Sequence, residues 1–290
     1  MGGHATISVV GASPAFVDLA FGLADRCEEL WSRFLPQSDI SRLNWAEGRA
    51  IQVDPLTVRL IEAMREGTDL TAGDFDPTLL PQVIATGYAA STVAPELVTT
   101  LPQSAIAPGN LRLIEIDGTT VRMPLGTTLD AGGIGKGLAA DLVCQLALAE
   151  GAWGIMAELG GDIVVAGEAP DGVAWLLGVE DPFDTSRHLT TVRIARGAIV
   201  TSSQRKRRFT TADGQHHHLV DPSTGASAST HIQTATVIAA TGARAEALAK
   251  SGFMRAPQEF LDWLPQVGGA ALLIDDAGEQ HVSTNWERYT

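Results

Sequence analysis

Hydrophobic residues along this chain recur with the spacing of helices in several segments. Between residues 16 and 34 they fall three or four positions apart, and a Ser-Pro pair just before them suits a helix start. Other segments also suggest helices, either because their apolar residues fall on one helical face or because they are rich in Ala and Leu. We therefore expect helices over residues 16–34, 56–70, 138–150, 243–253 and 257–264.

Shorter apolar segments that are bounded by turn residues predict strands. Single strands are expected at residues 5–10, 154–159, 162–166, 174–179 and 234–240. Paired segments around a short turn predict hairpins at residues 111–123, 191–201, 208–220 and around 275–278. Hairpins combined with long helices indicate an α+β fold with mixed, largely antiparallel sheets. Since no repeat or linker is visible, residues 1–290 are expected to form one domain of two closely joined lobes.

Four glycines lie within six residues between a predicted extended segment and the helix at 138–150, in the sequence LDAGGIGKGLAAD. Glycine lets a backbone approach a ligand closely, and the first free N–H groups of a helix favour an anion. Lys136 adds a positive charge, and Asp130 can accept a hydrogen bond. The segment fits neither the Walker loop nor the dinucleotide fingerprint. It is either a phosphate-binding turn of another kind or a turn that needs glycine only for tight packing.

The composition restricts the class of protein. With 45% hydrophobic and 19% charged residues over 290 positions, the chain is an ordinary globular protein. A net charge of −14 argues against binding to nucleic acid or to an anionic membrane. No apolar run is long enough to span a bilayer, and no leader pattern is visible, so a cytoplasmic location is expected unless a leader has been removed. Cys27 and Cys144 lie in helical patterns and suggest buried thiols.

Positive charge is concentrated in one segment of this acidic protein, TSSQRKRR at residues 201–208. Arginine suits bidentate contact with phosphate, although a solvated hairpin end would explain some of these residues. Three histidines follow at 216–218, and alternation along a strand would direct His217 away from the other two. They therefore do not form a metal site on one face, but His218 is a candidate for acid–base chemistry near neutral pH.

The chain resembles the ApbE family of FAD:protein FMN transferases over nearly its whole length. The segments that carry the resemblance are SDISRLN, FDPTLLP, LDAGGIGKGLAAD, LGGDI, TSS with Arg208, and HLVDPSTG, in this order. The resemblance implies a tunnelling-fold-like α+β body and a reaction that attaches FMN from FAD to Ser or Thr of a target protein and releases AMP. The target segment would resemble Asp-x-x-Ser/Thr-Gly-Ala-Ser/Thr, and residues 221–227 of this chain fit that pattern themselves.

The resemblance also implies roles for particular residues. His218 would activate the target hydroxyl, and the Gly133 carbonyl would help to hold Mg²⁺. The residues expected to contact FAD are Phe34, Phe75, Asp76, Thr78, Asp130, Lys136 and Arg208.

The family's other metal ligands would be an Asp and a Thr four residues later, where this chain has Glu246 and Lys250. Protonated lysine has no lone pair for Mg²⁺. Either Glu246 still reaches the metal, or the Lys250 ammonium partly replaces it, or the two form a plain surface pair. Two alternatives to transfer therefore stay open: an FAD-binding protein without transferase activity, and an FAD pyrophosphatase that gives FMN and AMP.

Overall fold

The computed structural model describes residues 3–13, 15–211 and 214–290. Its helices are α1 (Ala15–Trp31), α2 (Asp39–Asn44), α3 (Pro55–Leu70), α4 (Leu80–Ala85), α5 (Gly135–Ala149), α6 (Gly242–Met254) and α7 (Pro257–Trp263). The longest strands are β1 (Ala5–Val10), β5 (Gly154–Leu159), β6 (Asp162–Gly167), β7 (Trp175–Glu180), β8 (His188–Ile194), β9 (Gly197–Ser203), β12 (Ile232–Ala239) and β13 (Ala270–Asp275). Shorter strands are β2 (Ala50–Gln52), β3 (Glu115–Asp117), β4 (Thr120–Arg122), β10 (Arg208–Thr211), β11 (Gly214–His217) and β14 (Gln280–Val282). No helix in the described part of the chain is long and apolar enough to cross a membrane.

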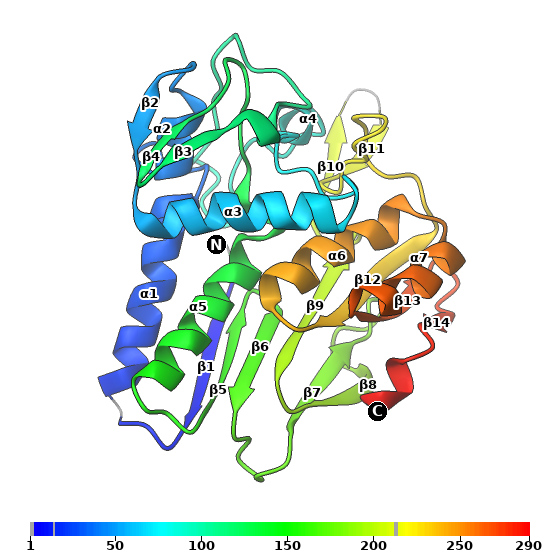
Figure 1. The fold of residues 1–290 in the computed structure, drawn as a ribbon. Coiled ribbons are helices and arrows are strands. Elements are labelled where there is room, and N and C mark those ends of the chain that lie inside the picture. The colour runs from blue at the N-terminus through cyan, green and yellow to red at the C-terminus, as the bar shows by residue number, and fades with distance from the viewer. Residues whose placement is uncertain (1–2, 14, 212–213) are drawn as a thin grey trace.

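One antiparallel sheet of seven strands forms the body of the protein, in the order β1-β5-β6-β9-β12-β13-β14 (Figure 1). Its central strands are buried on both faces. In β12, Val237 joins the hydrophobic cluster under the helices, while the neighbouring Ile238 joins the cluster on the opposite face. Side chains alternate between the faces of a strand, so adjacent buried residues in two different clusters mark a strand that is covered on both faces.

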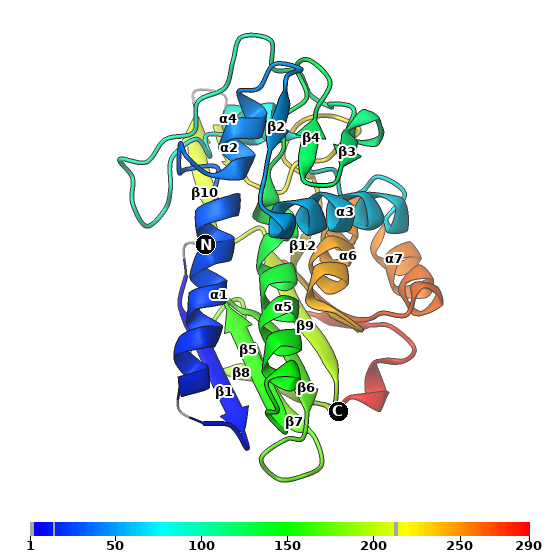
Figure 2. The same ribbon diagram turned by 60° about the vertical axis from the view of Figure 1, so that its left-hand side comes forward.

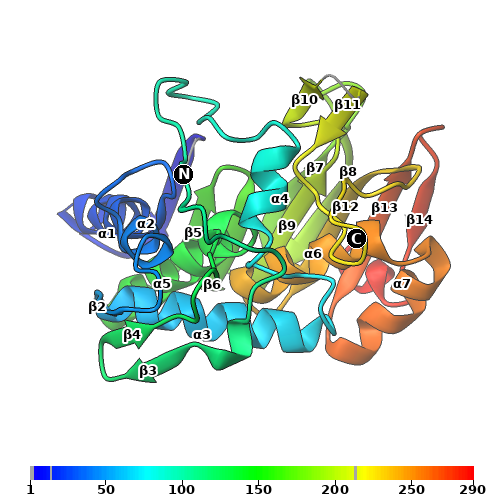
Figure 3. The ribbon, with the colours of Figure 1, turned by 90° about the horizontal axis from the view of Figure 1, so that it is seen from above.

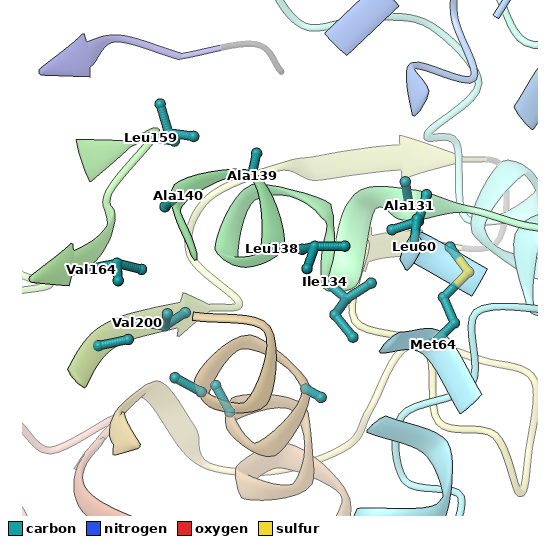
Figure 4. Close-up of a cluster of buried hydrophobic side chains, with 14 of the residues drawn as sticks. Leu60, Met64, Ala131, Ile134, Leu138, Ala139, Ala140, Leu159, Val164 and Val200 are labelled. Atoms are coloured by element: carbon teal, nitrogen blue, oxygen red, sulfur yellow. The ribbon is translucent and has the colours of Figure 1, made fainter. Parts of the chain in front are cut away.

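Helices cover one face of this sheet, and a smaller sheet covers part of the other. Figure 2 shows α1, α5 and α6 side by side over the first face. Ile134 and Leu138 at the start of α5 belong to the same core cluster as Leu60 and Met64 of α3 (Figure 4). On the second face, β7 and β8 add Trp175 and Val192 to the other hydrophobic cluster. The observed α+β fold with antiparallel sheets confirms the fold class expected from the sequence.

One predicted hairpin is wrong. The segments at 191–195 and 198–201 are both strands, but they do not pair with each other. β8 pairs with β7 in a two-stranded sheet, whereas β9 pairs with β6 and β12 in the large sheet. Gly197, with φ +136°, lies in the turn that carries the chain from one sheet to the other. A turn between two sheets has the same kind of residues as a hairpin turn, and the sequence alone did not distinguish them. In the 111–123 hairpin, the first segment is shorter than predicted because residues 111–113 form a 3₁₀ turn.

Helices α5 and α6 touch backbone to backbone where both begin. A Cβ built on Gly137 would lie 2.3 Å from the carbonyl carbon and oxygen of Gly242. The two helices also cap each other. Glu246 of α6 accepts a hydrogen bond from Gly137 N at 2.9 Å, and Asp141 of α5 accepts from Gly242 N at 2.7 Å and Ala243 N at 3.0 Å. The close contact therefore fixes Glu246 beside the first turn of α5.

We predict that Gly137→Ala destabilises the protein by about 1–3 kcal/mol or more, because a methyl group would overlap backbone atoms that cannot rotate away. Gly22 in the exposed face of α1 is the matched control, since a Cβ there meets no atom within 4 Å. Gly22→Ala should raise the free energy of unfolding by about 0.5–1 kcal/mol. Urea unfolding of both variants measures the difference, and equal midpoints would show that the helix contact is not tight.

Candidate functional site

The glycine-rich turn before α5 is held in shape by Asp130. The carboxylate of Asp130 accepts a hydrogen bond from Gly132 N at 2.9 Å and caps the 3₁₀ turn formed by residues 131–133. Its other oxygen lies 3.4 Å from Nε of the buried Arg33, at the exit from α1. The Asp130 backbone N–H donates to Pro77 O at 2.9 Å, which ties this turn to the loop after α3. Three separate segments therefore meet at Asp130.

Lys136 forms the centre of a buried ion-pair cluster. Its Nζ lies 2.7 Å from Asp162 Oδ2 and 2.5 Å from Glu246 Oε1. Gly160 and Gly161 form a tight turn with positive φ at both positions, which places Asp162 at the start of β6 beside Lys136. Burial opposes the charge on Lys136, but the two carboxylates outweigh it and raise the pKa of the lysine, so it stays protonated.

The same cluster acts on the pKa of Glu246. Burial alone would raise it, but Lys136 and Lys250 outweigh burial, so the pKa of Glu246 lies below its ordinary value. Glu246 is therefore an ionised carboxylate with only 1% of its side chain exposed.

Lys250 lies one helical turn after Glu246 and carries a second ammonium group into the site. Its Nζ donates to Ser202 Oγ at 3.0 Å and to the Glu246 backbone oxygen at 3.2 Å. Burial lowers the pKa of Lys250 from its ordinary value, and the neighbouring Lys136 acts in the same direction. The stem of Lys250 passes 3.6 Å from the point where a Cβ on Gly133 would lie, so the lysine sits directly against the glycine-rich turn.

Two adjoining hollows open beside this cluster. Residues of α4 line the first and Arg207, just before β10, lines both; Figure 3 shows where α4 and β10 lie in the ribbon. The first spans about 630 Å³, part of it open to solvent, and is lined by His218, Lys250 and Gly133, among others. The second spans about 1010 Å³, also partly open to solvent, and is lined by Phe34, Lys136 and the 91–97 segment. Both hollows share Tyr88, Asp130, Gly132 and Arg207 in their linings. The two hollows are therefore continuous along these four residues.

Aromatic and guanidinium groups are stacked at the boundary of the two hollows. The Arg33 guanidinium lies 4.3 Å from the Phe34 ring centroid and 4.6 Å from that of Tyr88. On its other side Tyr88 is stacked on Phe209 at 5.2 Å, with 17° between the ring planes. Arg33 also donates to the Tyr88 carbonyl oxygen at 2.8 Å. These contacts fix the rings of Phe34 and Tyr88, which are tilted by 55° to each other, at the edge of the second hollow.

His218 follows strand β11 and faces the first hollow. Its ring meets Tyr88 edge-on with centroids 6.3 Å apart, and its Nδ1 is buried with no hydrogen-bond partner among the described residues. Burial lowers the pKa of His218 well below the ordinary value, and the positive charges of Arg207 and Lys250 lower it further. The imidazole is therefore neutral at neutral pH. A neutral imidazole can accept a proton from a hydroxyl group.

The structure brings together most of the residues that the sequence singled out. Phe75, Asp76 and Gly133 line the first hollow with His218, Phe34 and Lys136 line the second, and Asp130 lines both. Thr78 lines neither hollow, since it is fully buried and its hydroxyl donates to Asp76 at 2.6 Å and accepts from Gly109 N at 2.9 Å.

The arginine expected at the ligand differs from the one that the structure places there. Arg208 is exposed at the start of β10, its Nε donates to Gln204 O at 3.0 Å, and it lines neither hollow. The neighbouring Arg207 lines both hollows, and its guanidinium lies 5.5 Å from the Tyr88 ring centroid. Arg207 has φ +58°, so the strand period does not extend back from β10 to this residue. A role of Arg208 in ligand binding stays a prediction.

Four residues at the site were not singled out from the sequence: Arg33, Tyr88, Asp162 and Arg207. Asp162 lies in the LGGDI segment. An acidic residue directly after a glycine turn could have been recognised there as a candidate site residue. Tyr88 and Arg33 are joined by contacts across 55 residues of chain, which no local pattern reveals.

The residues expected to hold Mg²⁺ fit that ion poorly. Both oxygens of Glu246 are already engaged, one by Lys136 and the other by Gly137 N, and the Lys250 ammonium stands beside Gly133. In the described part of the chain, no group of three or more His, Cys, Asp or Glu side chains is placed to hold a metal ion. A metal ion bound here would be repelled by the Lys250 ammonium. Two unit positive charges 4 Å apart repel by about 4 kcal/mol at an effective dielectric constant of about 20, and a divalent ion doubles this repulsion.

The fold and the site combine a buried ion-pair cluster with aromatic side chains at two adjoining hollows. Residues 1–274 match the ApbE family, and the chain belongs to this family. It is 28% identical over 261 residues to the FAD:protein FMN transferase of Treponema pallidum (strain Nichols), which covers 83% of this chain and 71% of that protein. It is also 28% identical over 279 residues to the FAD:protein FMN transferase of Vibrio cholerae serotype O1, with 92% of this chain and 82% of that protein covered.

Solved structures agree with the family match. The crystal structure of the ApbE protein from Thermotoga maritima MSB8 aligns with a TM-score of 0.83 and 25% identity, covering 98% of this chain and 94% of that one. The apo form of the flavinyl transferase ApbE from Pseudomonas stutzeri aligns with a TM-score of 0.81 and shares the fold at 21% identity, over 99% and 93% of the two chains. These matches confirm the family resemblance and the class of enzyme that the sequence predicted.

Lys136→Met should leave Asp162 and Glu246 buried without their partner. Removing one member of a buried ion pair costs about 3–5 kcal/mol, so we expect a large loss in the free energy of unfolding. The exposed pair between Lys206 and Glu180, at 3.1 Å, is the control, and Lys206→Met should change stability by less than about 1 kcal/mol. Urea unfolding near pH 7 tests this. Equal stability of the two variants would show that the buried cluster does not depend on Lys136.

Proposed function

We propose that this chain transfers the FMN half of FAD to a Ser or Thr hydroxyl of a target protein and releases AMP. The observation that carries the proposal is that His218, a histidine held neutral by its surroundings, and the ammonium group of Lys250 line the same hollow. Phosphoryl transfer from a diphosphate to a hydroxyl requires a base that takes the proton of the attacking hydroxyl. It also requires a cation that stabilises the negative charge on the leaving phosphate. The relatives named FAD:protein FMN transferase support the same activity.

The two hollows suggest how FAD would be held. The diphosphate would lie near the glycine-rich turn, where Lys136 and Lys250 converge, and a flat ring would lie against Phe34 and Tyr88. The combined hollow has separate polar and aromatic regions that match the two kinds of group in FAD. Because Asp130 and Arg207 line both regions, the ligand would pass them on its way from one hollow to the other.

In the proposed reaction, His218 removes the proton from the target hydroxyl as its oxygen attacks the phosphorus atom on the FMN side. A new P–O bond to the target forms, and the bond between this phosphorus and the bridging oxygen breaks. The bridging oxygen leaves as part of AMP, whose new negative charge would lie near the lysine ammonium groups. No step is assigned to Mg²⁺, because the described residues fit that ion poorly; the expectation of Mg²⁺ assistance remains a proposal from the family.

The target hydroxyl would come from another protein, with a segment such as Asp-x-x-Ser/Thr-Gly-Ala-Ser/Thr. Residues 221–227 fit this pattern, but Ser227 is engaged within its own turn. Its Oγ donates to His217 O at 2.8 Å and accepts from His217 N at 3.0 Å, and Ser227 lines neither hollow. This segment therefore contributes structure beside His218, which supports a separate protein as the acceptor.

Incubation of the chain with FAD and a target domain that contains such a segment tests the proposal. We expect the mass of the target to rise by one FMN, and AMP to appear in equal amount. Free FMN with AMP, and no change in the target, would indicate a pyrophosphatase. FAD that stays bound and intact with every target would contradict transfer and indicate a binding protein.

In the same assay, His218→Ala should lower the rate of transfer by roughly 10²-fold or more, because a positioned base is lost. FAD binding, followed by flavin fluorescence, should change little, since the proposed phosphate and ring contacts lie on other residues. His216→Ala is the control, because His216 lines neither hollow. An unchanged rate in His218→Ala would remove this residue from the mechanism.

The rate of transfer should stay high down to a pH below about 6.5, the ordinary pKa of histidine. A base works only when it is unprotonated, and the lowered pKa of His218 delays its protonation to more acidic solution. Activity is therefore lost as pH falls through the pKa of the folded state, below 6.5. A pH–rate profile with its acid limb at or above 6.5 would contradict this assignment.

A further inference from the structure

Lys250 presents to the reaction site an ammonium group that makes no direct ion pair with a carboxylate among the described residues. An ammonium group has three N–H donors, and two of those of Lys250 go to uncharged acceptors, Ser202 Oγ and the Glu246 backbone oxygen. Among the described residues, no carboxylate oxygen lies within ion-pair distance of its Nζ, whereas Lys136 has two such partners. The third N–H and the charge of Lys250 are therefore available to a ligand in the first hollow, which this residue lines.

The surrounding structure holds this ammonium in place. Glu246 and Lys250 lie four residues apart in α6, so they share one face of the helix. Glu246 is fixed by Lys136 and Gly137 N, and Ser202 reaches Lys250 from β9. Phe75 and Gly133 confine the turn beside the lysine stem, since a Cβ on Gly133 would lie 2.9 Å from the Phe75 ring. An ammonium that is already fixed by hydrogen bonds to β9 and to its own helix costs little to position when an anion binds.

The same contacts leave little room for a divalent ion. The two oxygens of Glu246 that would bind a metal are in use, and the ammonium already stands beside Gly133. The cluster of Lys136, Lys250, Asp162 and Glu246 contains two cations and two carboxylates, so its formal charge is zero before any metal binds.

We propose that the Lys250 ammonium contacts the diphosphate of FAD and supplies the charge that a divalent cation would otherwise supply, so that this chain binds and cleaves FAD without a divalent metal. The inference rests on the proposed function. As the bond to the bridging oxygen breaks, negative charge grows on the AMP phosphate, and the ammonium stabilises it by a charge-assisted hydrogen bond. Lys250 stays protonated throughout, so the proton balance still involves only the target hydroxyl and His218.

The first test uses the unaltered protein and needs no substitution. After removal of metals with EDTA, the affinity for FAD should equal the affinity in excess Mg²⁺ within about twofold, and calorimetric titration with MgCl₂ alone should show no binding. FMN transfer to the target should also continue in EDTA. FAD affinity or transfer that disappears in EDTA and returns with Mg²⁺ would overturn the inference.

The second test removes the charge. Lys250→Met should weaken FAD binding in EDTA by roughly ten- to a hundredfold, the usual effect of losing a hydrogen bond to a charged group. The chain has only three lysines, and Lys206→Met is the matched control, because Lys206 is exposed and paired with Glu180. Unchanged FAD affinity in a folded Lys250→Met protein would exclude the contact.

A third variant separates this inference from the proposed function. Glu246→Asp combined with Lys250→Thr removes the ammonium and supplies small oxygen ligands, so FAD binding by this double variant should become dependent on Mg²⁺. If the double variant binds FAD equally well in EDTA and in Mg²⁺, the role of Lys250 is contradicted, while transfer by the unaltered protein still stands. If the unaltered protein binds no FAD under either condition, the proposed function itself fails.

Discussion

The contact between α5 and α6 is the constraint on which the site depends. Each helix caps the other, since Glu246 of α6 accepts from Gly137 N while Asp141 of α5 accepts from the first two N–H groups of α6. This exchange is possible only because Gly137 and Gly242 let the two backbones meet. It places Glu246 where Lys136 can reach it, and one turn later it places Lys250 in the hollow. The positions of the Lys136 and Lys250 ammonium groups therefore depend on the two glycines, Gly137 and Gly242, whose lack of a side chain lets the helices meet.

The glycines of the glycine-rich turn have different surroundings: the tight-packing interpretation holds for Gly137, while phosphate binding by the turn stays a prediction. Gly137 permits helix packing and contacts no ligand space, whereas Gly132 and Gly133 line the hollows. The N–H of Gly137 is already bonded to Glu246, so it is not free to bind an anion. The positive groups that line the hollows are therefore side chains such as Lys136 and Lys250, rather than this donor at the start of α5.

Local patterns predicted the elements well and their partners less well. The helix periods and the apolar strands of the large sheet are properties of neighbouring residues, so β1, β5, β6 and α6 appear close to where they were expected. The hairpin at 191–201 was wrong because turn composition at Gly197 does not reveal which sheet each strand will join. Among site residues, those within recognisable segments were found, but Arg33 and Tyr88 are linked only through the folded chain.

The buried charges explain why Lys250 is tolerated in this site. A single ammonium in the interior is unfavourable unless it is paired or hydrogen-bonded. Here Asp162 and Glu246 together balance Lys136 and Lys250, although both carboxylates lie closest to Lys136. Lys136 therefore has the structural role of anchoring the carboxylates, and Lys250 keeps its charge turned toward the hollow. The cations that line the first hollow, Lys250 and Arg207, are therefore a local feature of a chain whose net charge is −14.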